Sequence, residues 1–479
     1  MFDTIHEECG VFGIRAKSRC NVAASAYYAL FALQHRGQES CGIAVNDRGV
    51  IHSHRDLGLV PDVFSERSLN ALGEGTMAVG HTRYSTTGTA LRVNAQPLVI
   101  RHVKGPMALA HNGNIANASL LKRELELSGA IFHTTNDSEV ISYVITHARL
   151  TASSIEEAIE RAMYRLEGAY SLVIMSARKL IAVRDPNGFR PLCIGQTDDG
   201  SILFASETCA LDSLGATFLR DVEPGEIIVV DERGMRSITT HCHQKKPGLC
   251  VFELVYFARP DSVVDGVAVH AARLKAGEFL WKEHPVEADV VIGVPDSGLD
   301  AALGYARASG IPYGVGMIKN RYIGRTFIQP TQGQREDAVR IKLNVLADTV
   351  RGKRVVMVDD SIVRGTTSAN LVNLLRRAGA KEIHMRISCP PFTHPCYFGT
   401  DIDSTENLIA CQMSIPEIGE KIGVDSLGFL SLEGIQRIAQ PHFGGFCVGC
   451  FSGRYPIEIP KDLPPDKFQF ELPDEEKER

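Results

Sequence analysis

Two adjacent carboxylates followed by a loop of small hydroxyl residues form the sharpest local signal in this sequence. In the stretch VVMVDDSIVRGTTS, Asp359 and Asp360 end a buried apolar run, and the loop opens directly into the helical pattern ANLVNLLRRAG. Loop N–H groups and the start of a helix can together hold a phosphate, while the carboxylates can bind sugar hydroxyls or lie near a metal. The stretch lacks the Gly-Lys-Ser/Thr ending of a P-loop. The alternative is an ordinary strand-to-helix turn with solvated acids.

A cysteine near the amino terminus is the second candidate for chemistry. Cys9 stands in IHEECGVFGI, directly after two glutamates. A lone cysteine is usually a buried core thiol, which is the alternative here. Four polar clusters follow it in the first half of the chain: LQHRGQES, GHTRYSTTG, AHNGNIAN and HTTNDSE. Each of them alone can be a plain turn, so their significance depends on their order behind Cys9.

The remaining cysteines suggest a metal site. FCVGCFSG contains a C-x-x-C pair, Cys447 and Cys450, while Cys250 and Cys396 lie far away in the sequence. Four thiolates admit Zn²⁺ or an iron-sulfur cluster, and the spacing alone does not choose between them. A redox dithiol or plain core packing stays open as well. We interpret the two further thiols of this region, Cys389 and Cys411, as core residues.

Length and composition limit what else the chain can be. The 479 residues are too many for one ordinary core, and 44% hydrophobic residues with a net charge of −6 are typical of a globular protein without bulk affinity for nucleic acid or membranes. No apolar run reaches the length of a membrane span, and MFDTIHEE is not a secretory signal. We therefore expect a cytoplasmic protein with reduced thiols.

The elements that must position these residues fall into two halves. Up to about residue 240, short β-branched strands are separated by turn signals such as Asp-Arg-Gly, with helical patterns at 21–37 and 154–168, so we expect an α+β domain. After the linker HCHQKKPG, residues 288–312 and 352–388 each read strand, loop, amphipathic helix, which predicts a parallel α/β sheet. The expected division is 9–242, 243–460 and a charged tail at 461–479.

The Asp359-Asp360 loop resembles that of the type I phosphoribosyltransferase family, whose substrate is phosphoribosyl pyrophosphate (PRPP). The resemblance implies that both aspartates hold the ribose hydroxyls and that the following loop wraps the 5-phosphate. It also implies a Mg²⁺ ion at Ser297, Asp359 and Asp360 to stabilise the departing pyrophosphate. The expected PRPP-binding residues are Asp359, Asp360, Ser361, Arg364, Gly365, Thr366, Thr367, Lys319 and Arg325.

The segment IKNRYIGRTFIQP, with Lys319, Arg321 and Arg325, offers basic residues beside glycine. Each one alone is an ordinary surface charge. Together, in a segment that could hinge, they suggest a lid over the pyrophosphate.

The four clusters behind Cys9, in this order, resemble the N-terminal nucleophile glutamine amidotransferases, which carry two antiparallel sheets between helix layers. The resemblance implies that residues 1–8 are a propeptide and that Cys9 becomes the terminal residue. Its α-amino group titrates at about 7.7 to 8.0 and could then act as general base for the thiol. Arg36 would border this nucleophile.

The same resemblance assigns the substrate contacts of the glutamine site. Arg83 would pair with the glutamine carboxylate, and Asp137 would hold its ammonium group. Asn112 and Gly113 would donate hydrogen bonds to the oxyanion, where one well-placed donor is worth roughly 3 to 4 kcal/mol.

An amidotransferase half joined to a phosphoribosyltransferase half resembles the glutamine phosphoribosylpyrophosphate amidotransferase family of purine synthesis. Membership would imply formation of 5-phosphoribosylamine, an ammonia tunnel, feedback inhibition by purine nucleotides and a homotetramer. The branch with a propeptide also carries a [4Fe-4S] cluster, here on Cys250, Cys396, Cys447 and Cys450.

Three rivals to this prediction remain. One is another amidotransferase with a sugar-isomerase half, which the Asp359-Asp360 loop disfavours. Another is a PRPP-sensing regulator without catalysis, and the third is an ammonia-only transferase with an unprocessed first half.

Overall fold

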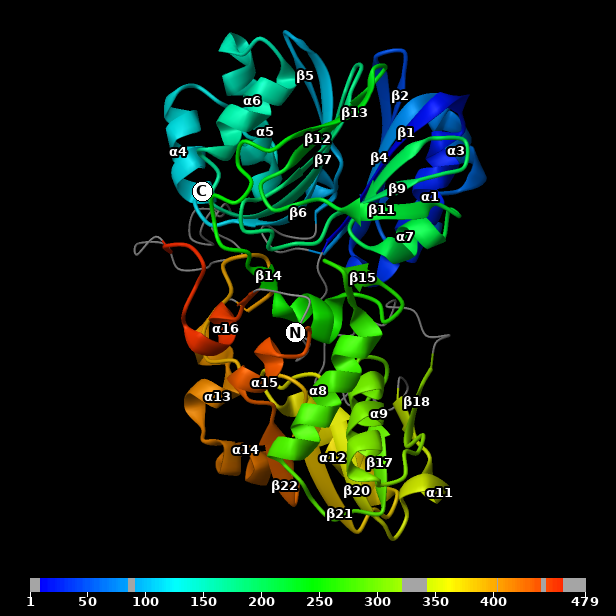
Figure 1. Ribbon diagram of the computed structural model, residues 1–479, viewed down its shortest axis with the longest axis vertical. Helices are drawn as coiled ribbons and strands as arrows, with labels where there is room; N and C mark the ends of the chain where they lie inside the picture. The colour runs from blue at the N-terminus through cyan, green and yellow to red at the C-terminus, as the bar shows by residue number, and fades with distance from the viewer. Residues whose placement is uncertain (1–8, 85–90, 321–342, 403, 441–444, 460–479) are drawn as a thin grey trace, which may run out of the picture.

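The computed structural model describes residues 9–84, 91–320, 343–402, 404–440 and 445–459. Figure 1 shows two halves stacked along the long axis, with strands β1 to β13 in the upper half and helices α8 to α16 in the lower half. The last strand of the upper half ends at Ile238, and the next strand begins at Leu249. The expected domain boundaries near residues 242 and 460 stay predictions. None of the described helices is long and apolar enough to cross a membrane.

The upper half is built on two antiparallel sheets, as expected. In the described chain one sheet has seven strands and the other six. The first runs in the order β11 (Thr217–Asp221), β9 (Cys193–Gln196), β10 (Ile202–Ala205), β1 (Gly10–Cys20), β4 (Gly75–Arg83), β2 (Ser40–Asp47), β3 (Val50–Leu57). The second runs in the order β13 (Gly234–Ile238), β12 (Ile227–Asp231), β8 (Leu180–Arg184), β7 (Gly168–Ser176), β6 (Gly105–Ile115), β5 (Leu98–His102).

Alternating side chains hold these two sheets and their helices in four layers. On β1, Val11 belongs to the core between the sheets, whereas its neighbour Phe12 packs toward α1. This is the period of two that strand geometry requires. The helices of the upper half are α1 (Val22–Ala32), α2 (Val60–Val63), α3 (Glu66–Leu72), α4 (Ala118–Leu127), α5 (Asp137–Thr151), α6 (Ile155–Met163) and α7 (Thr208–Asp212), with 3-10 turns η1 (Gln34–Arg36) and η2 (Arg92–Asn94).

Local sequence signals explain where these elements begin and turn. The Asp-Arg-Gly signal after β2 gives a two-residue hairpin loop in which Arg48 and Gly49 both have positive φ, the conformation that matches strand twist. The predicted helices at 21–37 and 154–168 form as α1 and α6. Asn21 and Ser154 cap them by accepting from main-chain N–H groups of the first turn.

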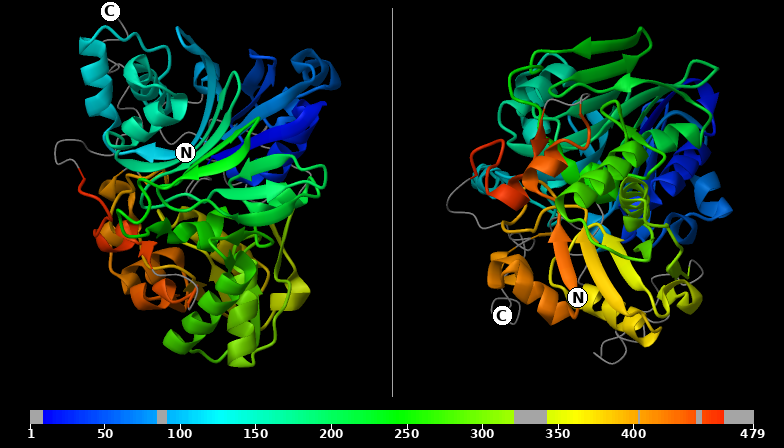
Figure 2. Two further views of the ribbon diagram at one scale, coloured as in Figure 1. Left: turned by 45° about the horizontal axis from the view of Figure 1, so that its top comes forward. Right: turned by 60° about the horizontal axis from the view of Figure 1, so that its bottom comes forward.

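The lower half contains the predicted parallel sheet. Its described strands run in the order β17 (Val290–Gly293), β20 (Arg354–Asp359), β21 (Glu382–Ile387), β22 (Ser426–Phe429), all parallel. Strands β20, β21 and β22 are the yellow to orange strands seen side by side in the right-hand view of Figure 2. The main helices are α8 (Val269–Glu283), α9 (Gly298–Ser309), α12 (Thr366–Arg377) and α14 (Ile415–Ile422).

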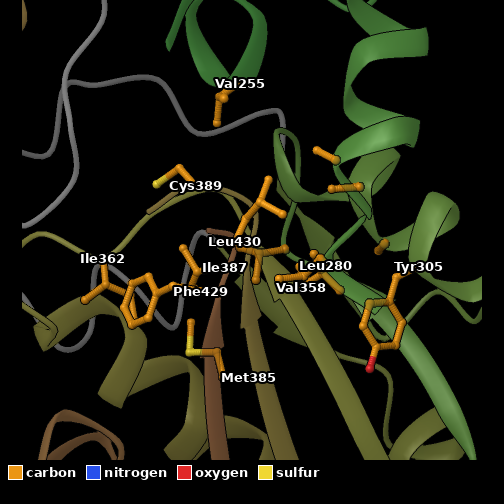
Figure 3. Packing of buried hydrophobic residues seen from close by; sticks show 14 of the residues in the cluster. Val255, Leu280, Tyr305, Val358, Ile362, Met385, Ile387, Cys389, Phe429 and Leu430 are labelled. Carbon is orange, nitrogen blue, oxygen red and sulfur yellow. The ribbon is translucent and has the colours of Figure 1, made fainter. Parts of the chain in front are cut away.

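An apolar core joins these helices to the sheet. Figure 3 shows Val358, Met385 and Ile387 from the strands meeting Leu280 from α8, all within one cluster of buried residues. Because parallel strands are buried on both faces, they read as unbroken apolar runs, as observed at 355–358. The carboxyl end of this sheet faces the upper half.

Short elements complete the lower half. They are β14 (Leu249–Cys250), a π-helical turn η3 (Glu253–Phe257), β15 (Val263–Val264), β16 (Val267–Ala268), β18 (Met317–Lys319), β19 (Leu343–Val345), α11 (Ala347–Val350), η4 (Thr405–Asn407), α13 (Ile409–Gln412), α15 (Leu432–Gln436), β23 (Phe446–Cys447) and α16 (Gly449–Ser452). In Figure 1, β14, η3 and β15 lie at the boundary between the halves.

Candidate functional site

Cys9 lies at the end of the upper sandwich that faces the lower half. It directly precedes β1, and only 4% of its surface is exposed. Its thiol donates to the main-chain carbonyl of Tyr84 at 3.3 Å. Tyr84 follows β4, which pairs antiparallel with β1 so that Gly10 is opposite Thr82. The register therefore brings the thiol to the end of β4, where the predicted Arg83 is found.

Arg36 borders Cys9, as predicted. It is fully buried, and its Nε donates to the main-chain carbonyl of Cys9 at 3.0 Å. The next residue, Gly37, explains how η1 comes so close to β4. A Cβ at Gly37 would lie 2.6 Å from main-chain atoms of Thr82 and Arg83.

Arg83 is a buried cation among acidic groups. It is 2% exposed, and this burial lowers the pKa of its guanidinium, while Cys9, Glu39 and Asp137 act in the opposite direction. Asp137 and Cys9 are thus both within electrostatic reach of Arg83. The structure therefore brings these three predicted residues into one site.

Asp137 begins α5 and is itself buried. Its carboxylate accepts from the main-chain N–H of Ile115 at 3.0 Å and lies 3.6 Å from Nδ1 of His111. A carboxylate at the first turn of a helix is also stabilised by the helix dipole. The fold thus places a carboxylate at this end of β6.

Asn112 and Gly113 lie on β6, opposite Ser171 and Tyr170 of β7. Asn112 is fully buried, yet within the described residues neither its side-chain oxygen nor its nitrogen has a hydrogen-bond partner. Such a group is costly unless something binds it. Gly113 has φ of 132°, and a Cβ there would lie 2.3 Å from the carbonyl oxygen of Ala169. Only glycine fits this position.

Two histidines without a predicted role connect the sheets beside this site. Nε2 of His81 on β4 lies 2.9 Å from the carbonyl oxygen of His111 on β6. The contact joins the two strands just before Arg83 and Gly113. Burial lowers the pKa of His81 to about 3, which makes it too weak a base to accept a thiol proton at neutral pH.

The second predicted site lies at the carboxyl end of the parallel sheet. Asp359 ends β20 and Asp360 follows it, each 8% exposed. Both Ser297 and Ser361 donate from their hydroxyls to Asp360. Burial raises the pKa of Asp359, and the neighbouring Asp360 raises it further. Burial also raises the pKa of Asp360, although Ser297, Ser361 and Arg273 act in the opposite direction. The pair is therefore poised to gain from a cation or from sugar hydroxyl donors.

The predicted phosphate loop opens into a helix as expected. Gly365 has a left-handed conformation with φ of 86° and caps α12, whose first turn contains Thr366 and Thr367. The first N–H groups of a helix have no partner within it and can bind an anion. Arg364 precedes this turn. The four residues thus surround the helix start, next to the two aspartates.

Ser297 stands in the loop before α9, and Lys319 lies nearby on β18. Nζ of Lys319 forms an ion pair with Asp296 at 2.9 Å. Both residues of this ion pair line a cavity of about 590 Å³, together with Tyr313 and Asn344. Arg321 and Arg325, the other basic residues of the expected lid, and the expected propeptide 1–8 lie outside the described residues.

The four cysteines predicted to bind a cluster come together at the boundary between the halves. Cys250 on β14 is directly opposite Cys447 on β23 in a short parallel pair. Burial, then Cys250, raises the pKa of the Cys447 thiol, with a smaller contribution from Cys396. Burial, then Cys396, Cys250 and Cys447, raises that of Cys450. The side chains of the described residues form no ready group of three or more metal ligands, so the thiols would turn inward to bind one.

Of the two extra thiols, only one is a core residue. Cys389 is fully buried, as predicted, but Cys411 is exposed, so that prediction is wrong. It lies on the short helix α13, where Ile409 takes the buried position. Cys411, two residues later, lies on the opposite, exposed face of the helix.

Three contacts between the halves were not predictable from motifs. Tyr84 donates from its hydroxyl to Asp401 at 3.4 Å, and Asn114 donates to the carbonyl of Tyr397 at 3.0 Å. The third is an ion pair between Arg36 and Glu253 of η3. The run CVFELVYFA indicates that Glu253 needs a partner, because a carboxylate among apolar residues is rarely buried without one, but it does not indicate which residue that partner is.

Comparisons with known proteins cover both halves. Residues 81–213 match the family described as glutamine amidotransferase domain, and residues 268–425 match the phosphoribosyl transferase domain family. The chain is 51% identical to an amidophosphoribosyltransferase of Synechocystis sp., covering 98% of this chain and 95% of that protein.

Solved structures agree over nearly the whole chain. One, titled as the allosteric regulatory enzyme of purine biosynthesis, matches with a TM-score of 0.90 at 47% identity, covering 96% of this chain and 99% of that one. Another is the glutamine PRPP amidotransferase of B. subtilis complexed with ADP and GMP, with a TM-score of 0.88 at 47% identity, covering 95% and 99%.

Proposed function

The chain belongs to the amidophosphoribosyltransferase family, and from this premise we propose how its residues divide the reaction. The reaction is glutamine-dependent transfer of ammonia to PRPP, which yields 5-phospho-β-D-ribosylamine, glutamate and pyrophosphate in purine biosynthesis. The observation that carries the division of roles is the convergence of Cys9, Arg83 and Asp137 in one half, with the Asp359-Asp360 loop in the other.

Glutamine binds in the upper half. Its carboxylate pairs with Arg83, whose planar fork of donors fits that group, and its ammonium group pairs with Asp137. Both side chains are buried, so each gains from an opposite charge that arrives with the substrate. This orientation directs the amide of glutamine toward Cys9.

Cys9 is the nucleophile after removal of residues 1–8. Its free α-amine takes the thiol proton, since buried His81 is too weak a base, and the sulfur attacks the amide carbon. The resulting oxyanion accepts from the Asn112 amide and the Gly113 N–H. The C–N bond then breaks, the amine returns its proton to the leaving nitrogen, and ammonia departs from a thioester. Water hydrolyses the thioester to glutamate and restores the thiol.

PRPP binds in the lower half. Asp359 and Asp360 accept from the ribose hydroxyls, and the loop from Ser361 to Thr367 donates main-chain N–H groups to the 5-phosphate. Lys319 and Arg325 neutralise the pyrophosphate. Ammonia attacks the anomeric carbon as the bond to pyrophosphate breaks, and the nitrogen then loses a proton.

A Mg²⁺ ion suits the same end of the sheet. Two adjacent buried carboxylates of raised pKa, next to the Ser297 hydroxyl, are hard oxygen donors of the kind Mg²⁺ prefers. When bound, the ion supplies charge stabilisation to the departing pyrophosphate. Ser297, Asp359 and Asp360 would hold it.

The four boundary cysteines suit a [4Fe-4S] cluster. Cys250 lies opposite Cys447, and the other three cysteines all act electrostatically on Cys450. Four thiolates are the usual ligand set of such a cluster. The cluster would tie the end of the chain to the start of the lower half. We assign it a structural role.

Further family properties follow as proposals. They are an ammonia path between the sites closed by the segment around Lys319, a homotetramer, inhibition by purine nucleotides and a cytoplasmic location. A relative has been solved with ADP and GMP bound, which supports the proposed inhibition.

The test is the intact mass of the denatured protein together with product formation from glutamine and from ammonium. We expect a mass lacking residues 1–8 and activity with both nitrogen sources, with PRPP stimulating glutamine hydrolysis. A full-length mass with ammonium-dependent activity only would identify an ammonia-only transferase. No turnover with either source, but retained PRPP binding, would instead identify a PRPP sensor.

A further inference from the structure

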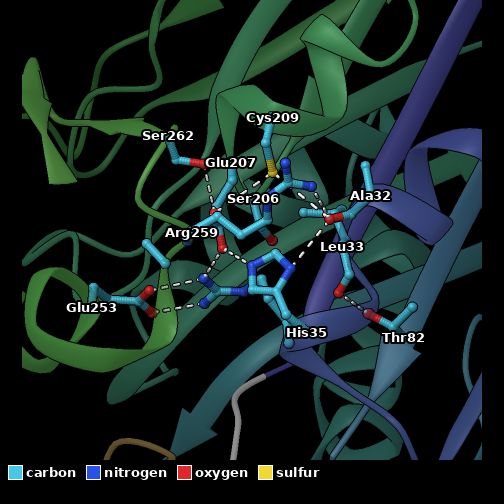
Figure 4. Close-up of polar contacts among 12 residues, drawn as sticks. Ala32, Leu33, His35, Thr82, Ser206, Glu207, Cys209, Glu253, Arg259 and Ser262 are labelled. Carbon is cyan, nitrogen blue, oxygen red and sulfur yellow. Dashed lines mark hydrogen bonds and ion pairs between the residues drawn. The ribbon is translucent and has the colours of Figure 1, made fainter. Parts of the chain in front are cut away.

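A network of buried charges joins the two halves directly behind Cys9. Four of its residues are fully buried, namely Arg36, Arg190, Glu207 and Glu253. Arg190 belongs to it through an ion pair with Glu253 at 3.3 Å. Two are cations and two are anions, so the charges balance. Glu207 and Glu253 both form ion pairs with Arg36. Figure 4 shows the side chains of Glu253 and Glu207 pointing toward one guanidinium.

Every nitrogen of the Arg36 guanidinium has a partner. Glu253 accepts from Nη1 at 2.9 Å and from Nη2 at 2.8 Å, and Glu207 accepts from Nη1 at 2.7 Å. The remaining nitrogen, Nε, is the one that reaches the Cys9 carbonyl. A two-point carboxylate contact defines the plane of the guanidinium, which one contact to Glu207 does not. The direction of Nε therefore depends on Glu253.

Glu253 belongs to the other half of the protein and is firmly held there. It begins η3, and the main-chain carbonyls of Leu254 and Ala258, within and just after this turn, accept from Arg273 at 2.9 and 2.7 Å. Arg273 comes from α8 and is 4% exposed. Burial lowers the pKa of Arg273. Asp360 of the proposed PRPP loop is one of the acidic groups that act in the opposite direction.

The two glutamates of this network keep the buried Arg36 guanidinium charged. Burial alone lowers the pKa of Arg36, but Glu253 and Glu207 outweigh it, so the pKa lies above its ordinary value. A buried cation that loses one partner is strongly destabilised or moves to find another. Movement of Arg36 would release the carbonyl of Cys9.

We propose that Glu253 is a positioning residue for the glutaminase nucleophile: the transferase half, through Glu253, orients Arg36 so that it holds the Cys9 carbonyl. The proposal rests on the proposed function of Cys9. Once residues 1–8 are removed, Cys9 is a chain end with one main-chain attachment, and chain ends are mobile unless they are tied down. A displacement of about 1 Å at a reacting atom can reduce the rate about 100-fold.

The test compares two substitutions that remove one carboxylate across the same boundary. Glu253→Gln leaves a hydrogen-bonding side chain of the same shape but no charge. The matched control is Asp265→Asn, because Asp265 also forms a two-point pair with a buried arginine of the upper half, Arg184, at 2.7 and 2.8 Å. The other hydrogen bonds of Arg184 go to main-chain carbonyls of its own half, so this pair reports on boundary disruption alone.

We expect Glu253→Gln that has lost residues 1–8 to lose about 10- to 100-fold in kcat with glutamine. Its KM for glutamine and its ammonium-dependent activity should stay within about twofold, since Glu253 touches neither substrate. Asp265→Asn should keep both activities within about twofold of wild type. In Glu253→Gln, Cys9 should also react more slowly with an electrophilic glutamine analogue than in the wild-type protein.

Other outcomes would overturn the proposal. If Glu253→Gln loses glutamine and ammonium activity together, or no more glutamine activity than Asp265→Asn, Glu253 has only a structural role. If Glu253→Gln does not fold, Glu253→Asp keeps the charge but shortens the reach, and the same selective loss is required of it. A wild-type enzyme without glutamine activity would instead contradict the proposed function of Cys9.

Discussion

The side-chain amide of Asn114 donates to the main-chain carbonyl of Tyr397 at 3.0 Å. Asn114 lies two residues beyond Asn112 on β6, and Tyr397 follows Cys396. The strand with the proposed oxyanion donors is thus tied to a cysteine segment of the other half. Loss of a cluster on those cysteines would therefore disturb both the fold of the lower half and the glutamine site.

Cys447→Ser should remove the proposed cluster. Cys447 is buried opposite Cys250, and loss of a metal site is among the changes that destabilise by about 4 kcal/mol or more. We expect iron and sulfide content to fall and the thermal midpoint to drop. Cys411→Ser is the control, because Cys411 is exposed. It should keep the iron and sulfide content and the thermal midpoint of the wild-type protein. Unchanged iron in Cys447→Ser, or zinc in the wild-type protein, would contradict the assignment.

Cys9→Ala should abolish the glutamine-dependent reaction and spare the ammonium-dependent one. The thiol is the proposed nucleophile, whereas the Asp359-Asp360 loop belongs to the other half. Product formation with each nitrogen source measures the split. Cys20→Ala, at the far end of the same strand and exposed, is the control and should leave both activities unchanged. Glutamine turnover by Cys9→Ala would exclude Cys9 as nucleophile.

Asn112→Ala should lower kcat with glutamine by about 100- to 1000-fold, the effect of losing one oxyanion donor. It should cost little stability, because the Asn112 amide has no partner among the described residues. Asn46 offers the opposite case, since its amide donates to Ser176 at 2.8 Å and accepts from Gly49 at 2.8 Å. Asn46→Ala should lower stability by about 1 to 3 kcal/mol and keep kcat. Steady-state rates and urea unfolding of both variants test this contrast.

Asp360→Asn should lower product formation from glutamine and from ammonium alike, by about 100-fold or more. Its carboxylate accepts from Ser297 and Ser361 at the proposed ribose site. Asp289→Asn is the control, because Asp289 pairs with Arg354 at 3.0 Å at the opposite end of β20. It should keep full activity. Normal PRPP affinity in Asp360→Asn, measured by calorimetry, would argue against the assignment.

Asp221 should make stability depend on pH. Burial, then Asp265, raises its pKa from 3.8 to about 7, against the effect of Arg184. Between these values the folded protein keeps a proton that the unfolded chain releases, so stability falls as pH rises from about 4 to 7 and then levels. The fall is at most about 1.4 kcal/mol for each pH unit in this range. Asp221→Asn should lack this fall in unfolding free energy, and an equal fall in both proteins would refute the prediction.

The sequence by itself determined the two chemistries and the architecture that holds them. Asp359 and Asp360 after a buried run, and Cys9 ahead of four polar clusters, are the local patterns that carry the resemblance to the two families. The periods of strands and helices predicted both halves because they reflect short-range geometry. The predicted Arg36 contacts Cys9, and Cys9 and Asp137 both act electrostatically on the predicted Arg83.

Only the tertiary structure decided how the two halves meet. The pairing of Arg36 with Glu253, 217 positions apart, and the contact of Asn114 with Tyr397 depend on packing that no local pattern encodes. The error at Cys411 has the same origin, since a short helix shows which side faces the core only once it is packed. Buried charges must find partners, so the fold selects them from wherever the chain brings opposite charge.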